Sequence, residues 1–166
     1  MRKYLVIGNP IEHSLSPKLH NYWFEKNNVN ANYSKRKIDK NEIQEVISEI
    51  RDKKLDGINV TVPFKSDVIP FLDKLSEESK ITQSVNTIYM HNDKLIGHNT
   101  DIKGFELSLG ETHFNLKDKK VFILGAGGVV PSIIYALEKA GVSKIIVSNR
   151  TKQRAEDLKK NFPNIY

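Results

Sequence analysis

Segments with the pattern of strands alternate with segments with the pattern of helices along the whole chain, and this alternation limits the possible folds most strongly. Short apolar runs that are bounded by glycine, proline or polar residues predict strands. The expected strands are residues 4–8, 31–37, 57–62, 85–89, 94–98, 120–124 and 144–148. The expected helices are residues 16–26, 41–53, 66–75, 102–109, 129–140 and 152–160. Strands that alternate with helices favour an α/β fold with parallel sheets.

The expected helix over residues 102–109 separates two patterns. Residues 1–101 are predicted to form one α/β domain, a mostly parallel sheet flanked by helices. Within it, residues 43, 46, 47 and 50 are apolar and share one helix face, while residues 58, 60 and 62 share one strand face. Residues 102–166 contain a strand, a helix and a second strand, the order of a βαβ unit.

The composition excludes several classes of protein. The chain of 166 residues has no cysteine, which rules out disulfides, iron–sulfur ligation and thiolate zinc sites, so we expect a reducing, cytoplasmic location and no metal centre. No apolar run approaches the ~20 residues that span a bilayer, which argues against a membrane partner. The net charge of +6 suits an anionic partner. Because the lysines alternate with acidic residues and do not interleave with aromatic ones, we expect small anions and no nucleic acid.

A glycine-rich turn follows the expected strand over residues 120–124. Gly125, Ala126, Gly127 and Gly128 stand where a strand meets a helix, so the backbone could approach a pyrophosphate whose charge is met by free N–H groups. This arrangement predicts part of a Rossmann-type domain that binds a dinucleotide. Val130 departs from the usual Gly or Ala at its position and should push the helix outward. A strand-to-helix turn without a ligand is the alternative.

The residues after the second strand of the βαβ unit favour NADP over NAD. A site selective for NAD has an acidic residue there, whereas a site selective for NADP has arginine near the 2′-phosphate. The segment contains Arg150, Lys152 and Arg154, with no acid before Glu156. Alternatively, Thr151 caps a helix with a solvated basic first turn, although basic residues oppose the helix dipole there. The candidate NADP-binding residues are Gly125, Ala126, Gly127, Gly128, Asn149, Arg150, Thr151, Lys152 and Arg154.

Four polar clusters stand out in residues 1–101. They are Ser14-Leu15-Ser16-Pro17, Asn59-Val60-Thr61-Val62-Pro63-Phe64-Lys65, Asn86-Thr87 and Asn99-Thr100-Asp101. Singly, each has a plain structural interpretation, since Ser16 and Asp101 could cap helices and Asn59 and Thr61 could face solvent. Together, at the ends of strands in an α/β sheet, they are typical of a site for a polyhydroxylated ligand.

These four clusters, together with the glycine-rich turn and Asn149-Arg150-Thr151, resemble the shikimate dehydrogenase family in order and spacing over the whole chain. The resemblance implies NADPH-dependent, reversible reduction of 3-dehydroshikimate to shikimate, in chorismate and aromatic amino-acid biosynthesis. It implies that Ser14 and Ser16 hold the substrate carboxylate and that Asn59, Thr61, Asn86 and Asp101 contact ring hydroxyls. Lys65 and Asp101 would form the catalytic pair. The family continues beyond residue 166, so the second domain is expected to be partial, and a homodimer is compatible with the resemblance.

Lys65 suits the chemistry that this resemblance implies. Hydride transfer to a ketone builds negative charge on the oxygen, which needs a positioned proton donor or positive charge. A lysine ammonium supplies both, and Asp101 would hold it charged and oriented.

Two alternatives remain open: a quinate/shikimate dehydrogenase, and a non-catalytic fragment that binds substrate but lacks the rest of the nucleotide domain.

Overall fold

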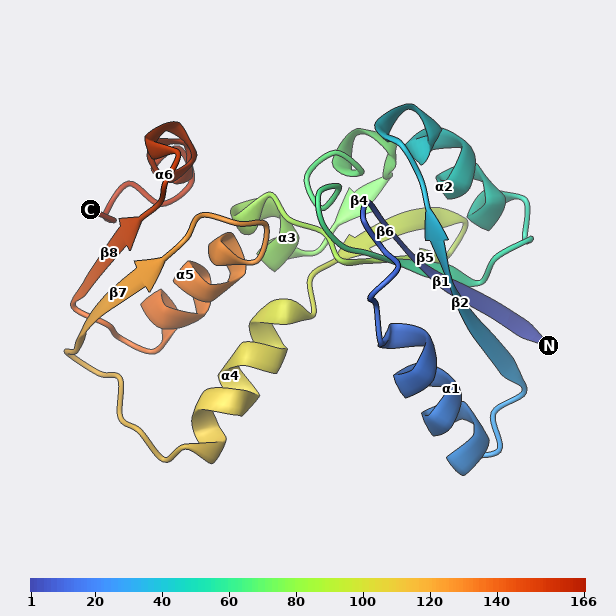
Figure 1. Cartoon of the computed structure of the whole chain (residues 1–166), viewed down its shortest axis with the longest axis horizontal. Coiled ribbons are helices and arrows are strands. Elements are labelled where there is room, and N and C mark those ends of the chain that lie inside the picture. Colours follow the sequence, from blue (N-terminus) through green and yellow to red (C-terminus); the bar gives the residue numbers. More distant parts are fainter.

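The computed structural model describes residues 1–166 and contains two separate sheets (Figure 1). The first sheet has six strands in the order β2-β1-β3-β5-β6-β4, and the second consists of β7 and β8. The strands are β1 Arg2–Gly8, β2 Ala31–Lys37, β3 Gly57–Val60, β4 Lys74–Leu75, β5 Thr87–His91, β6 Lys94–His98, β7 Lys120–Leu124 and β8 Lys144–Ser148. The α-helices are α1 Ser16–Lys26, α2 Ile43–Arg51, α3 Glu77–Thr82, α4 Asp101–Glu111, α5 Val130–Lys139 and α6 Lys152–Leu158.

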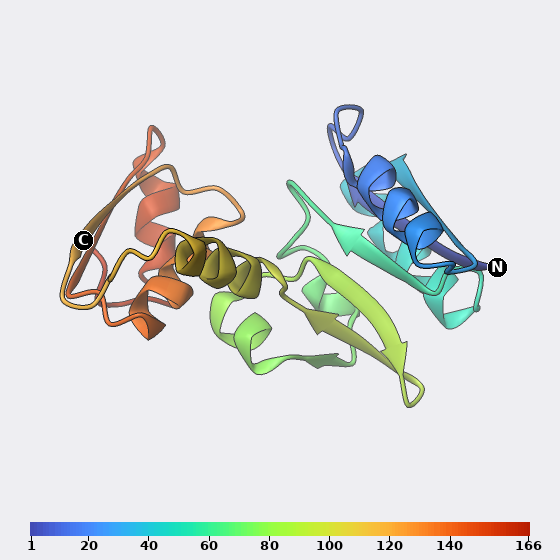
Figure 2. The same ribbon diagram turned by 90° about the horizontal axis from the view of Figure 1, so that it is seen from below.

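The strand pairing confirms the predicted α/β class. In the first sheet β1 pairs in parallel with β2 and β3, and β4 pairs in parallel with β6. Strand β5 is antiparallel to both β3 and β6. In the second sheet β7 and β8 are parallel, with Lys120 opposite Lys144 and Leu124 opposite Ser148. Figure 2 shows α4 leading from the first sheet to the second.

Two helices lie on opposite faces of the six-stranded sheet (Figure 1). The apolar stripe of α2, Ile43, Val46, Ile47 and Ile50, is buried against β1, β3 and β5, as its spacing predicts. Helix α1 lies on the other face, where both polar atoms of the Asn21 side chain bond the backbone of Tyr33 on β2. No residue of α1 is fully buried.

The helix expected over residues 66–75 is wrong. The segment forms turns, a short 3₁₀ helix over Ile69–Phe71 and then β4. Pro70 lacks a backbone N–H and disfavours the helical conformation of the residue before it. Asp73 accepts a 2.7 Å hydrogen bond from the Leu95 amide, which holds the next residues beside β6. The α-helix begins instead after Ser76, whose hydroxyl accepts from the amide of Ser79.

Strand β3 is shorter than its alternating pattern predicts. The Thr61 amide still donates to the Ile7 carbonyl, but β3 ends at Val60. Val62 is therefore 54% exposed and does not share the buried face of Ile58 and Val60. No helix of the chain combines the length and hydropathy needed to cross a membrane.

Gly97 on β6 provides a test of the packing under the first sheet. A Cβ added there would lie 2.5 Å from Leu72 Cδ1 and 3.0 Å from Val85 Cγ2, whereas one added at Gly104 on α4 would meet nothing within 4 Å. We expect Gly97→Val to lower the free energy of unfolding by about 1–3 kcal/mol because the core is overpacked. Gly104→Val should leave it within about 0.5 kcal/mol. Urea unfolding of both variants checks this, and equal stabilities would contradict the packing described here.

Candidate active site

A polar cavity of about 500 Å³ opens at the edge where β1 and β3 end. Because β5 is antiparallel to β3 and β6, the start of β5 and the end of β6 lie at the same edge. The cavity is lined by Val6, Ser16, His20, Tyr33, Asn59, Val60, Thr61, Lys65, Asn86, Thr87, Thr100 and Asp101. Six of these residues were expected at the site from the sequence alone, namely Ser16, Asn59, Thr61, Lys65, Asn86 and Asp101.

Lys65 and Asp101 form an ion pair at this cavity. Lys65 Nζ lies 2.6 Å from Asp101 Oδ2, and the two side chains are 12% and 23% exposed. The turn that carries Lys65 is anchored by its buried neighbours Phe64 and Val68. Asp101 is the first residue of α4 rather than its N-cap, a position held by Thr100. Its carboxylate is therefore free to bind the lysine.

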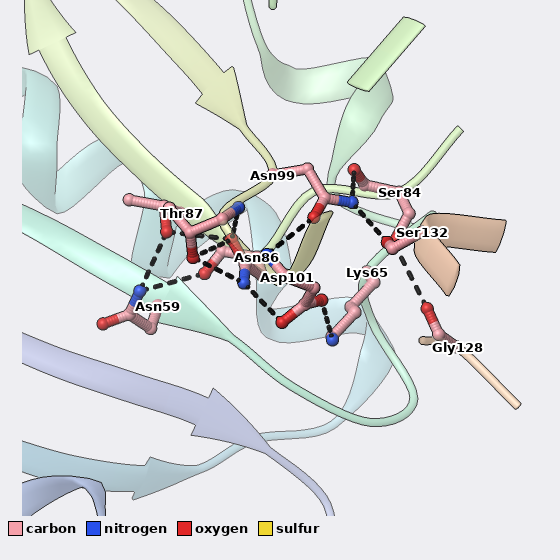
Figure 3. A network of polar contacts seen from close by, with 10 residues as sticks. Asn59, Lys65, Ser84, Asn86, Thr87, Asn99, Asp101, Gly128 and Ser132 are labelled. Carbon is pink, nitrogen blue, oxygen red and sulfur yellow. Dashed lines mark hydrogen bonds and ion pairs between the residues drawn. The ribbon is translucent and has the colours of Figure 1, made fainter. Parts of the chain in front are cut away.

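Asn86 orients the carboxylate of Asp101 from the other side. Its Oδ1 accepts a 3.0 Å hydrogen bond from the Thr100 amide, which can only donate, so its Nδ2 faces Asp101 Oδ1 at 2.8 Å. Each carboxylate oxygen of Asp101 thus has its own donor, one from Lys65 and one from Asn86 (Figure 3). This arrangement holds the ammonium of Lys65 at a defined point of the cavity wall.

Asn59 belongs to the same network. Its Nδ2 donates to the Asn86 carbonyl and to Thr87 Oγ1, both at 3.0 Å, and its Oδ1 accepts from the Tyr33 hydroxyl at 2.6 Å. Burial raises the pKa of Tyr33, so its hydroxyl keeps its proton.

The hydroxyls of Ser16 and Thr61 line the cavity and have no hydrogen-bond partner in the protein. Ser14 does not line the cavity, and its Oγ instead accepts from the Ser16 amide at 3.3 Å. Partial burial lowers the pKa of His20, which favours its neutral form. The cavity therefore offers the unpaired hydroxyls of Ser16 and Thr61, the imidazole of His20 and the amino group of Lys65.

Sequence reasoning did not select His20, Tyr33, Thr87 or Thr100 as site residues. The sequence contained a signal for His20, because this residue follows Ser16 by four positions and so shares its helix face. Thr87 and Thr100 were part of the polar clusters. Tyr33 carried no such signal, since only the pairing of β2, β1 and β3 brings it opposite Asn59.

The glycine-rich turn presents free amides at the start of α5. Gly125 has φ +114°, a conformation that favours glycine, and its amide donates to the Ser148 carbonyl at 2.7 Å. The amides of Gly127, Gly128 and Val129 donate to no acceptor in the protein. Successive free N–H groups at the N-terminus of a helix suit a phosphate group. Val130 follows them as a buried residue of the second core.

The basic residues after β8 lie beside this turn. Asn149 accepts from the Ala126 amide and donates to the Thr151 carbonyl, so it joins the two loops. Arg150, Lys152 and Arg154 are exposed and form no ion pair, as the ion pairs of the chain lie elsewhere. Thr151 stands at the N-cap position of α6, but its side chain makes no capping hydrogen bond. Both features favour an anion site over a simple capped helix.

The turn and the ion pair are neighbours. A Cβ added at Gly128 would lie 3.8 Å from Lys65 Cδ, and the Ser84 hydroxyl donates to the Gly128 carbonyl at 3.3 Å. Asn99 Nδ2 donates to Ser132 Oγ on α5 at 2.8 Å (Figure 3). Lys65, which lines the polar cavity, therefore lies beside the glycine-rich turn.

Two family models match the chain. The model described as "Shikimate dehydrogenase substrate binding domain" matches residues 6–88, and that described as "Shikimate / quinate 5-dehydrogenase" matches residues 108–166. The first match lies within the part of the chain that forms the six-stranded sheet, and the second includes β7 and β8.

Individual relatives agree with these matches. The shikimate dehydrogenase (NADP(+)) of Pelagibacter ubique is 60% identical over 99% of this chain and 62% of its own length. A crystal structure of shikimate dehydrogenase from Aquifex aeolicus superposes with a TM-score of 0.92 and 40% identity, covering all of this chain and 62% of that one. The Thermus thermophilus enzyme in complex with NADP(H) and shikimate gives a TM-score of 0.88 and 32% identity, over 100% of this chain and 63% of that one.

The chain thus spans somewhat less than two thirds of the length of the relatives that it matches. Within that span, the family models, the sequence identity and the structural superposition all point to the same family. The chain belongs to the shikimate dehydrogenase family.

Proposed function

We propose that the chain carries the NADP-dependent, reversible reduction of 3-dehydroshikimate to shikimate, a step of chorismate and aromatic amino-acid biosynthesis. The observation that supports this best is the position of the Lys65–Asp101 pair. Both residues line the polar cavity, and the Lys65 side chain also lies beside Gly128 of the glycine-rich turn. A proton donor is needed where a polyol ligand and a dinucleotide meet.

Lys65 supplies the proton in this proposal. NADPH, when bound, supplies the hydride. As the carbonyl carbon gains the hydride, its oxygen takes up the electron pair of the C=O bond, and Lys65 Nζ donates a proton to that oxygen. The lysine is left neutral and Asp101 stays ionised. In the reverse direction, Lys65 accepts the hydroxyl proton of shikimate.

We assign the substrate-binding roles to the polar groups of the cavity that are unpaired or are held in a fixed orientation. The unpaired hydroxyl of Ser16 at the start of α1 would bind the substrate carboxylate, with Ser14 beside it. Thr61, Asn59, Asn86 and Asp101 would contact the ring hydroxyls. A site of this kind discriminates by hydrogen bonds, because a buried polar group that loses its partner is costly.

The coenzyme-binding roles rest on the second sheet. The turn of Gly125, Ala126, Gly127 and Gly128 would bind the pyrophosphate through its free amides. Arg150, with Lys152 and Arg154, would bind the 2′-phosphate, while Asn149 and Thr151 form the loop that carries them.

We further propose that residues 1–101 form the substrate domain and residues 102–166 the first part of the NADP-binding domain. A cytoplasmic location and a homodimer stay predictions from the sequence.

The direct test mixes the chain with shikimate and NADP⁺ and follows the formation of NADPH. Turnover supports the proposal. Shikimate binding without turnover supports the alternative of a non-catalytic fragment. If the chain shows no binding and no turnover, both the proposal and this alternative are overturned. Replacing shikimate by quinate in the same assay distinguishes the quinate/shikimate alternative, which predicts comparable rates for the two substrates.

Lys65→Ala should lower turnover about 100-fold or more, since general acid catalysis contributes factors of this size. The dissociation constant of shikimate should change much less, because Asn59, Asn86 and Thr61 stay in place. The matched control is Lys103→Ala, an exposed lysine on α4. Near-normal turnover of Lys65→Ala, measured with saturating substrates, would contradict its catalytic role.

Arg150→Ala should weaken the binding of NADP⁺ about 10-fold or more and the binding of NAD⁺ much less. The reason is that only NADP⁺ carries the 2′-phosphate with which Arg150 would form a hydrogen bond between charged groups. Titration calorimetry with both coenzymes measures the difference. Lys120→Ala, an exposed cation at the other end of β7, serves as the control. If both coenzymes lose affinity equally, Arg150 does not bind the 2′-phosphate.

A further inference from the structure

The orientation of the Asn59 side-chain amide is determined by its protein partners. The Asn86 carbonyl can only accept, so the group 3.0 Å from it must be the NH₂ of Asn59. The second N–H points to Thr87 Oγ1. Both donors of Asn59 are thereby used within the protein, and Oδ1 is the atom left to face a ligand.

Tyr33 is the one donor that the protein provides to this oxygen. Its hydroxyl lies 2.6 Å from Asn59 Oδ1, an atom that can only accept, so the hydroxyl donates. Tyr33 is itself 4% exposed. Its ring stacks on His20 with centroids 4.2 Å apart and planes at 9°. Its backbone carbonyl accepts from Asn21 Nδ2, and its amide donates to Asn21 Oδ1. The position of Tyr33 is thus secured without help from Asn59.

The hydrogen bonds that start at Tyr33 run in one direction. Tyr33 donates to Asn59, and Asn59 donates to Thr87 Oγ1. Thr87, having accepted, donates its single proton to Asn86 Oδ1 at 3.0 Å. Asn86 then donates to Asp101, which holds Lys65. Successive bonds of this kind polarise one another, so the first donor supports the last acceptor.

We propose that Tyr33 is a positioning residue of the substrate site: its hydroxyl holds Asn59 Oδ1 in place and is the first donor of the hydrogen-bond chain that ends at Asp101. As a result, Asn59 presents an acceptor to the ligand and selects a hydroxyl that donates. The part of this inference that concerns shikimate rests on the proposed function.

The test compares Tyr33→Phe with Tyr4→Phe. Tyr33→Phe keeps the ring that stacks on His20 and removes only the donor. Tyr4 on β1 packs near Phe24, and its hydroxyl has no hydrogen-bond partner in the protein, so Tyr4→Phe removes an unbonded hydroxyl from the same face of the sheet. Thermal unfolding confirms that both variants are folded.

Two readouts follow on the folded chain. The NMR signals of the Asn59 side-chain amide should shift and lose order in Tyr33→Phe and stay unchanged in Tyr4→Phe. The dissociation constant of shikimate, from calorimetry, should rise about 3- to 10-fold in Tyr33→Phe, the loss expected for one net hydrogen bond. In an Asn59→Ala background, Tyr33→Phe should have no further effect on this constant, because Tyr33 acts through Asn59.

The outcomes separate this proposal from the proposed function. An ordered, unshifted Asn59 amide in Tyr33→Phe overturns the positioning role, as does an equal effect of Tyr33→Phe with and without Asn59. If the unmodified chain does not bind shikimate, the proposed function fails, and the NMR comparison alone decides the role of Tyr33. If Tyr33→Phe does not fold, the unmodified chain provides the decision: a Tyr33 hydroxyl proton that exchanges rapidly with water in the NMR spectrum overturns the positioning role, and a protected one supports it.

Discussion

The buried amide of Asn99 links the part of the chain that forms the first sheet to helix α5 of the second. Its side chain is 2% exposed, so its donors and acceptor need partners in the protein, and an unmet group would cost about 1–3 kcal/mol. Asn99 donates to the Ser84 carbonyl and to Ser132 Oγ, and it accepts from the Asp101 amide. It therefore joins the loop before β5, helix α5 and the start of α4. Asp101 and the helix that follows the glycine-rich turn therefore share one anchor.

The cavity results from the mixed pairing of the first sheet. In an all-parallel sheet, the start of β5 would lie at the opposite edge from the end of β3. Because β5 runs antiparallel, Asn86 at its start meets Asn59 near the end of β3, and Asp101 follows the end of β6. Three segments far apart in the sequence thus supply one hydrogen-bond network. The network is rigid because its side-chain amides have partners that are fixed backbone groups.

The patterns that local residues determine were predictable, and those that need a distant partner were not. The apolar stripe of Ile43, Val46, Ile47 and Ile50 and the strands β2, β6, β7 and β8 follow from periodicity. The expected helix over residues 66–75 failed because Pro70 and the bond from Leu95 to Asp73 favour an extended segment beside β6. Val62 continued an alternating pattern, but β3 ends two residues earlier. Val130 is buried in the second core, and the outward displacement of the helix expected from this residue stays a prediction.

The sequence by itself determined the α/β class, the polar clusters and the basic segment after β8, because residue type and spacing carry these features. It also placed Lys65 and Asp101 among the candidates. Only the tertiary structure decided that these two side chains meet at 2.6 Å beside Gly128, and that the Tyr33 hydroxyl donates to Asn59. The reason is physical: a hydrogen bond depends on the distance and direction of its two groups, and for residues on different strands these are set by sheet order and register rather than by neighbours in the chain.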